Sequence, residues 1–199
     1  MNIIWHGHSC FEITGKDGTI VFDPYQANSV PGLNSLKLKA NLVLCSHEHD
    51  DHNARNCVEV APKDFKVTCI ETSHDHHQGS HRGKNTIHIV DFEDLKVVHM
   101  GDIGCMMDDV SKLKNCDVLM IPIGGYYTID TKEALKYIER IQPRIVIPMH
   151  YCSHEFGYDV LSTNEGFIQK SSNIVYVDDY LEVHKETKGQ TIVFKKPRN

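Results

Sequence analysis

Short apolar runs recur along this chain and alternate with polar stretches that contain Gly, Pro, Asn or Asp. Runs of this length, bounded by turn-forming residues, are typical of β-strands. They predict strands at residues 2–5, 10–13, 19–23, 42–46, 67–70, 86–91, 96–99, 118–121, 145–149, 173–177 and 191–194. A turn at residues 15–18 should make a hairpin of the second and third strands, and residues 92–94 should form another tight turn.

Residues 131–142 instead show helical spacing of apolar positions. The residues that share its apolar face are Ala134, Leu135, Ile138 and Ile141. Asp130 or Thr131 can cap its first turn. A shorter helix is expected near residues 54–61, ended before Pro62, and a loop at residues 28–40. This order of elements predicts an α/β fold.

The composition narrows the class of protein. The chain has 199 residues, 40% of them hydrophobic and 24% charged, so we expect one globular domain spanning residues 1–199. The net charge of −6 weighs against a nucleic-acid partner. Seven scattered cysteines without a C-x-x-C pair favour free thiols and a cytoplasmic location. We expect neither a signal peptide nor a membrane span, because the first residues lack a basic and an apolar region and no apolar run is long enough.

The most informative segment follows the predicted strand at residues 42–46 and reads His47-Glu48-His49-Asp50-Asp51-His52. Two histidines at i and i+2 project from the same side of an extended backbone, so both can reach one ion. Asp51 and His52 follow at once and can serve an adjacent ion. Clustered imidazoles and carboxylates are the preferred ligands of zinc and related metals. The segment is therefore predicted to bind metal rather than to form an ordinary polar loop.

Further candidate ligands stand where other predicted strands end, which is where folds of this kind place their chemistry. They are His74, Asp102 and His150. Each has a simpler explanation by itself, since Asp102 could be a turn residue and His150 a packed core histidine. The residues alone do not decide between His74 and its neighbours His76 and His77.

Together these motifs resemble the metallo-β-lactamase superfamily, in particular its branch of small metal-dependent hydrolases that includes the ascorbate-6-phosphate lactonase-like proteins. The resemblance rests on the cluster above, on Gly7-His8-Ser9, and on the segments at residues 22–25, 99–102, 121–125 and 147–151. It implies an αββα sandwich of two mixed sheets flanked by helices, with the metals at one edge.

The resemblance also implies a division of the ligands between two divalent ions. The first ion would be bound by His47, His49 and His74. The second would be bound by Asp51, His52 and His150, and Asp102 would bridge the two. Zinc is the expected metal, while manganese or iron would suit the same ligands. Asp51, Asp102 and His150 are expected to act in catalysis, around a water that the metals make acidic enough to attack as hydroxide.

Other residues could contact the substrate or support the ligands. Arg82, with Lys84, could bind an anionic group of a small-molecule substrate, although a solvated basic loop is the simpler explanation. His8 could line the pocket or orient a ligand, or make a structural hydrogen bond, and Asp23 could likewise support a ligand. His99 is predicted to be a buried structural histidine. Pocket-rim positions are possible for Tyr126 and His154.

Three classes of function fit this chain. A metal-dependent hydrolase that cleaves an ester-like bond, in a lactone or a phosphodiester, fits best. A diiron oxidoreductase of the same superfamily fits less well. Such enzymes typically carry Glu at the position of His49 and an added flavin domain, for which 199 residues leave no room. A non-catalytic metal-binding module would not need so complete a ligand set. Substrate identity does not follow from the ligands, because one fold serves many chemistries.

Overall fold

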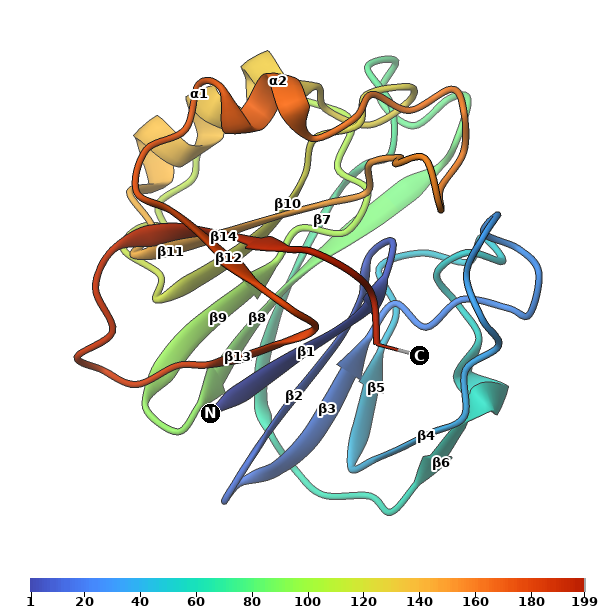
Figure 1. Cartoon of the computed structure of the whole chain (residues 1–199), viewed down its shortest axis with the longest axis vertical. Coiled ribbons are helices and arrows are strands. Elements are labelled where there is room, and N and C mark those ends of the chain that lie inside the picture. Colours follow the sequence, from blue (N-terminus) through green and yellow to red (C-terminus); the bar gives the residue numbers. More distant parts are fainter. Residues whose placement is uncertain (199) are drawn as a thin grey trace.

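The computed structural model describes residues 1–198. Two large β-sheets pack face to face, and a two-stranded ribbon and short helices lie outside them (Figure 1). The strands are β1 (Asn2–Gly7), β2 (Cys10–Gly15), β3 (Gly18–Phe22), β4 (Leu38–Ala40), β5 (Leu42–Leu44), β6 (Val58–Val60), β7 (Lys66–Ser73), β8 (Lys84–Phe92), β9 (Leu95–His99), β10 (Val118–Pro122), β11 (Ile145–Met149), β12 (Ile174–Val177), β13 (Tyr180–Glu182) and β14 (Gln190–Phe194). The helices are the 3₁₀ turn η1 (Arg55–Cys57), α1 (Thr131–Ile141) and α2 (Glu165–Ile168).

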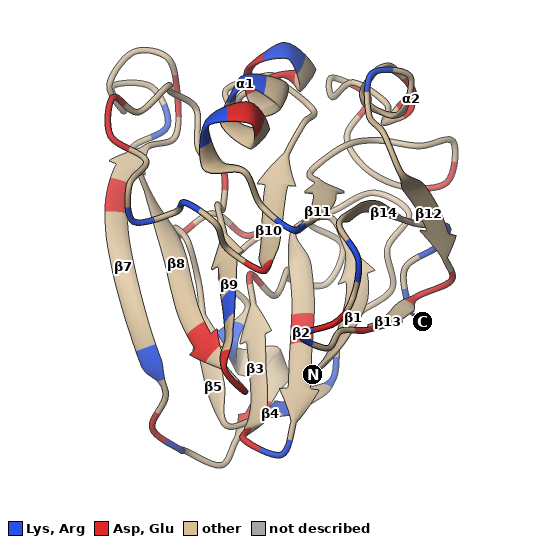
Figure 2. Cartoon of the chain, turned by 90° about the vertical axis from the view of Figure 1, so that its left-hand side faces the viewer, with Lys and Arg blue, Asp and Glu red and all other residues tan. Residues whose placement is uncertain are grey.

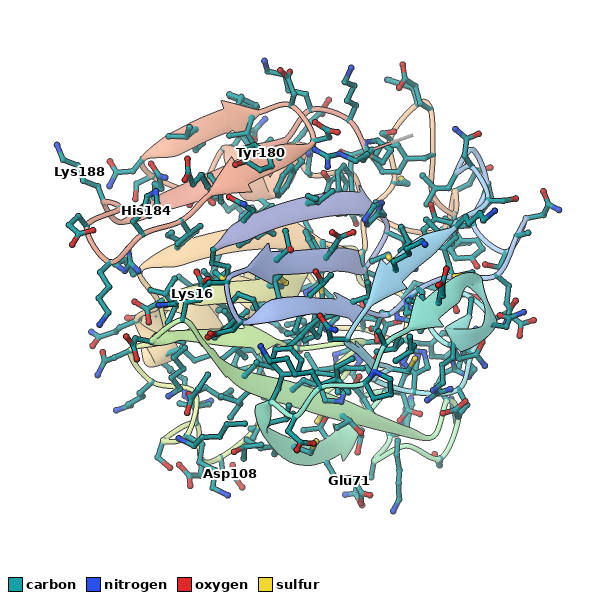
Figure 3. All side chains as sticks on the ribbon, turned by 90° about the horizontal axis from the view of Figure 1, so that it is seen from below. Lys16, Glu71, Asp108, Tyr180, His184 and Lys188 are labelled. Carbon is teal, nitrogen blue, oxygen red and sulfur yellow. The ribbon has the colours of Figure 1, made fainter. Side chains whose placement is uncertain are left out.

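Five strands in the order β13-β1-β2-β3-β5 make the first sheet. The predicted hairpin forms its centre, since β2 and β3 pair antiparallel with Ile13 opposite Ile20. Strand β5 adds parallel to β3, so the sheet is mixed. Figure 3 looks onto this sheet from outside, with Lys16 at the β2–β3 turn and Tyr180 on β13.

Seven strands in the order β12-β14-β11-β10-β9-β8-β7 make the second sheet. Its central strands β9, β10 and β11 are parallel to one another. Strand β8 pairs antiparallel with β9 on one side and with β7 on the other. All residues of β10 and β11 are buried, as expected for interior strands covered on both faces. Strands β7, β9 and β11 therefore run in one direction and end at the same edge of the sheet (Figure 2).

The main hydrophobic core fills the space between the two sheets. Phe11 and Phe22 enter it from the first sheet, and Val97 enters it from the second. His99 lies in the same layer, fully buried, with its ring stacked on Phe22 at 5.0 Å. Its Nε2 lies 2.9 Å from the Ser9 carbonyl oxygen, so His99 is the satisfied structural histidine that the sequence predicted.

Helices α1 and α2 cover the outer face of the seven-stranded sheet (Figure 1). The side chain of Asp130 accepts the Glu133 backbone N–H and Glu133 bonds back to Asp130, which makes a capping box. Helix α1 ends at Ile141 because Gln142 takes a left-handed conformation with φ of 55°. On the predicted face Ala134 and Ile141 are buried, and Tyr137 joins them with its hydroxyl bonded to the Cys105 carbonyl.

The outer face of the five-stranded sheet carries no α-helix among residues 1–198. The parallel β4–β6 ribbon and η1 cover the part of this face that lies beside β3 and β5, around a second small core that includes Val21 and Val58. The helix predicted at residues 54–61 is therefore wrong beyond its first turn, because Val58-Glu59-Val60 pairs with β4. The mixed sheets agree with the predicted sandwich, whereas its helical layer is present on only one side. Pro24, Pro31 and Pro62 interrupt the segment that would have to supply the other layer.

Two further predictions need correction. The strand at residues 42–46 was expected to be buried, but β5 is shorter, lies at the edge of its sheet and keeps partly exposed side chains. The loop at residues 28–40 ends in strand β4, and the sequence pattern did not predict α2 or β13. Short elements of three or four residues carry too little periodicity to be recognised. No helix within residues 1–198 has the length and apolar character needed to cross a membrane.

Candidate metal centre

The predicted ligands come from loops that follow four strands. His47 to His52 follow β5, His74 follows β7, Asp102 lies beyond β9, and His150 directly follows β11. Because β7, β9 and β11 end at one edge, and β5 of the facing sheet ends near it, these loops converge. The side chains of all seven predicted ligands meet there in one cluster, although His47 and His150 are more than a hundred positions apart in the chain.

Three histidines form the group predicted for the first ion. Each of His47, His49 and His74 offers a ring nitrogen within 4.8 Å of those of the other two. The ring of His47 lies 4.6 Å from that of His49 and 4.5 Å from that of His74. Three converging imidazoles are a suitable donor set for zinc.

Asp51, His52 and His150 form the group predicted for the second ion, and His8 joins them. The Oδ2 of Asp51 lies 3.6 Å from His52 Nε2 and 3.3 Å from His8 Nε2. His8 is 1% exposed, and its ring contacts those of His52 and His150, so its side chain faces the ligands.

Asp102 lies between the two groups. Its Oδ2 is 3.4 Å from His74 Nε2, 3.3 Å from His52 Nε2 and 2.9 Å from His150 Nε2. The carboxylate therefore contacts both groups, as a bridging ligand must. Its place is fixed by the backbone, because the Asp102 N–H donates to Asn85 Oδ1 at 2.8 Å. The preceding Gly101 has φ of 55°, and a Cβ there would lie 2.3 Å from the same Asn85 oxygen, so only glycine fits.

His74 is the histidine of its loop that reaches the cluster. His76 instead contacts Glu133 of α1 at 3.1 Å, and the ring of His77 lies 4.4 Å from that of His81. The loop is held by buried Asp75, whose carboxylate accepts backbone N–H groups from His77, Gly79, His81 and Arg82. These bonds hold the pKa of Asp75 below its ordinary value, against the effect of its burial.

Asp23 orients two of the ligands. Its carboxylate accepts the Ser46 N–H and the Ser46 hydroxyl, both at 2.6 Å, and lies 2.8 Å from His52 Nδ1. A carboxylate only accepts, so His52 carries a proton on Nδ1, and Nε2 is the nitrogen that it can offer to a metal ion. The Ser46 hydroxyl proton is used by Asp23, so His47 Nδ1, at 2.9 Å, donates to that hydroxyl and Nε2 is again left free. Asp23 thus supports the ligands, as the sequence allowed.

The cluster suits a cation. His47 Nε2, His52 Nε2 and Asp102 Oδ1 are buried and have no hydrogen-bond partner within residues 1–198, an unfavourable state for polar atoms unless an ion binds them. Burial, followed by the charge of His52, lowers the pKa of His47 to about 3, which keeps it neutral. Burial alone would lower the pKa of His52, but Asp102 and Asp51 outweigh it and raise that pKa well above its ordinary value. A site that favours a proton there also favours a metal ion.

A cavity of about 300 Å³ opens onto the cluster, a volume at the small end of the range for small-molecule sites. Its lining residues are His49, Asp51, His74, Arg82, Asp102, Tyr126, Tyr127, His150, Tyr158, Val160 and Leu161. Among the described residues Arg82 is the one lysine or arginine in this lining, and its guanidinium carbon lies 4.4 Å from the Tyr127 ring centroid, a cation–π contact. Lys84 pairs with Glu71 at 2.9 Å outside the cavity, where Figure 3 shows Glu71 at the periphery.

The sequence predicted part of this lining. Arg82 and Tyr126 lie in the lining, as the sequence analysis suggested, whereas His8 and His154 do not. The sequence analysis did not predict Tyr127, Tyr158 or Val160. Of these, only Tyr127 could have been suspected, because it belongs to the Gly-Gly-Tyr-Tyr segment after β10. Tyr126 and Tyr127 both have positive φ, 52° and 68°, a strained backbone of the kind that clusters at functional sites.

Comparison with known proteins identifies the family of this chain. Residues 2–150 match the family model for the beta-lactamase superfamily domain. A UPF0173 metal-dependent hydrolase from Staphylothermus marinus is 32% identical over 188 residues, covering 73% of this chain and 81% of the relative. Another from Thermoplasma acidophilum is 29% identical over 189 residues, covering 76% and 83%.

A crystal structure from Thermotoga maritima has the same overall fold. It is named as a candidate Zn-dependent hydrolase of the metallo-β-lactamase superfamily, and it superposes with a TM-score of 0.78 at 26% identity, covering 97% of each chain. The histidine and aspartate groups described above could hold a metal ion. The chain therefore belongs to the beta-lactamase superfamily and, within it, to the UPF0173 family of metal-dependent hydrolases.

Proposed function

We propose that this protein is a dinuclear, zinc-dependent hydrolase that cleaves an ester-like bond, in a lactone or a phosphodiester, of a small anionic substrate. The observation that carries the proposal is the position of Asp102, whose Oδ2 contacts His74 of one ligand group and His52 and His150 of the other. A shared carboxylate offsets the repulsion between two cations held close together. When bound, such ions supply Lewis acidity and a water acidic enough to act as nucleophile near neutral pH.

The residues of the chain divide the remaining work. Asp51, Asp102 and His150 belong to the ligand groups and, like His49 and His74, line the cavity. They are the proposed catalytic residues, because they surround the position of the second ion and the bridge on the side that a substrate would face. Arg82, stacked on Tyr127 at the cavity wall, would bind an anionic group of the substrate. The open cavity beside the ligands also favours catalysis over a purely structural metal site, which would be closed.

The proposed nucleophile is water, and no Ser or Cys of the chain is expected to form a covalent intermediate. Ser46, which directly precedes His47, donates its proton to Asp23 and is not activated by a free histidine. The cysteines are all unpaired, in line with the proposed reducing, cytoplasmic location.

The test is elemental analysis of protein purified without chelator, together with a panel of lactones and phosphodiesters. We expect about two zinc ions per chain, loss of turnover with a chelator and recovery with zinc or manganese. Single turnover in H₂¹⁸O should place solvent oxygen in the first product formed. Active protein with one ion per chain would contradict the dinuclear site. Iron together with oxygen- or nitric oxide-dependent redox turnover would establish the oxidoreductase, and tight metal binding without turnover of any substrate would establish the binding module.

A further inference from the structure

His8 has a role that neither the fold nor the predicted ligand set explains. It lies in the tight turn between β1 and β2 with a positive φ of 52°. Its carbonyl oxygen accepts the Trp5 indole N–H at 3.2 Å and the His150 backbone N–H at 3.5 Å. The backbone of His8 is therefore tied directly to that of a predicted ligand.

The His8 side chain points into the second ligand group. Its ring centroid lies 4.3 Å from that of His150 and 5.2 Å from that of His52. Its Nε2 lies 3.3 Å from Asp51 Oδ2. The four residues offer ligand atoms that all lie within 4.8 Å of one another.

The separation of these atoms matches that of two ligands of one ion. Ligands that lie roughly 2.0–2.1 Å from zinc at tetrahedral angles are about 3.3–3.4 Å apart. His8 Nε2 and Asp51 Oδ2 are 3.3 Å apart, the same distance that separates Asp102 Oδ2 from His52 Nε2.

No packing role accounts for a histidine at this position. The Nδ1 of His8 is buried without a hydrogen-bond partner in the described part of the chain, so the ring is not fixed by the backbone as that of His99 is. His6, two residues earlier, contacts Glu12 at 3.2 Å outside the ligand groups. If the ring served only packing, an apolar side chain of similar size would give the protein a higher free energy of unfolding.

We infer that His8 is a ligand of the second ion, beside Asp51, His52 and His150. The inference rests on the second ion of the proposed function. It assigns a role to the Gly7-His8-Ser9 turn between β1 and β2, which presents this imidazole to the ion beside the ligands from the loops after β5 and β11. The second ion would then be held by two loops of the five-stranded sheet and one of the seven-stranded sheet.

Two variants separate a ligand from a hydrogen-bond donor to Asp51. His8→Gln places an amide N–H near the position of Nε2, so it keeps a donor and loses the imidazole, whereas His8→Ala loses both. His6→Gln is the matched control, since it changes a buried histidine of the same segment outside the cluster. Metal-free proteins, checked by circular dichroism, are titrated with Zn²⁺ against a chromophoric chelator and with Co²⁺ by visible absorption.

We expect both His8 variants to weaken the second ion by more than about 100-fold, beyond the effect of losing an outer hydrogen-bond partner. The first ion should keep its affinity, the Co²⁺ spectrum of the second site should change, and His6→Gln should bind both ions like the wild type. If His8→Gln keeps the second ion while His8→Ala loses it, His8 is only a donor and the inference is overturned. Wild-type affinity in both variants would overturn it too.

A crystal structure of the zinc-loaded wild type provides a test that needs no variant. We expect His8 Nε2 within about 2.1 Å of the second ion. A separation of about 3 Å or more would overturn the inference while leaving the dinuclear site intact. A wild-type protein that binds a single ion in these titrations would instead refute the proposed function and, with it, the role of His8.

Discussion

Asp23→Asn should change the protonation of His52, a predicted metal ligand, without changing the shape of the site. Burial alone would raise the pKa of Asp23, but His52 and His99 outweigh it and hold that pKa below its ordinary value, so the side chain is an ionised acceptor. Asparagine keeps the size and tolerates the φ of 43° at this position. Its amide, however, has one accepting oxygen and two N–H donors.

The consequences follow from the three atoms that Asp23 contacts. If the amide oxygen of the variant keeps the Ser46 N–H, the amide nitrogen faces the Ser46 hydroxyl and His52 Nδ1, which lie 2.6 and 2.8 Å from the native carboxylate. Nδ1 of His52 must then accept, and its proton moves to Nε2, the atom that would bind metal. To bind metal through Nε2, His52 must carry its proton on Nδ1, where it faces an N–H of the new amide. The hydrogen bond between them is then lost, which costs about 1–3 kcal/mol of metal-binding free energy.

That free energy corresponds to a fall of about 5–150-fold in affinity for the second ion, a range that includes the usual effect of losing an outer hydrogen-bond partner, about 10–100-fold. Competition titration of metal-free protein with Zn²⁺ measures it. Asp117→Asn is the control, because Asp117 accepts from Arg144 and the Lys96 N–H far from the cluster and should change stability alone. The reasoning is refuted if Asp23→Asn binds both ions as tightly as the wild type, or if the control loses as much affinity.

Three further changes test other parts of the structure. Asp102→Ala should lose the second ion and most of the turnover, while the fold is retained because core strands carry the stability. Elemental analysis and an activity assay measure this. A variant with two ions and full turnover would show that Asp102 is only a turn residue. Arg82→Gln should raise KM for anionic substrates about 10-fold, because one charge-assisted contact is lost, with kcat nearly unchanged. The control Lys84→Gln should leave KM unchanged, because Lys84 pairs with Glu71 outside the cavity. Equal effects of the two variants would exclude a specific role for Arg82. Asp130→Ala removes the α1 cap and should cost about 1 kcal/mol, seen as a fall of roughly 2–4 °C in Tm; an unchanged Tm would mean that the cap is not needed.

Local sequence pattern determined most of the strands and the main helix. Apolar runs bounded by Gly, Pro and Asp predicted eleven strands that the structure contains, and the spacing over residues 131–142 predicted α1. These predictions succeeded because side-chain periodicity and turn chemistry are properties of neighbouring residues. The helix expected at residues 54–61 failed because pairing of β6 with β4, a contact between distant segments, outweighed local propensity.

The candidate ligands could also be predicted, because His47 to His52 bring metal-binding chemistry together within six positions of the chain. What the sequence could not decide was which distant side chains complete the site. Asp23 fixes the tautomer of His52, His8 contacts Asp51, and Arg82 lies over Tyr127. Each of these pairs is separated by dozens of residues, so their contacts depend on how the two sheets pack and where their loops converge. Only the tertiary structure decides such contacts, since nothing in the local pattern of either partner records the position of the other.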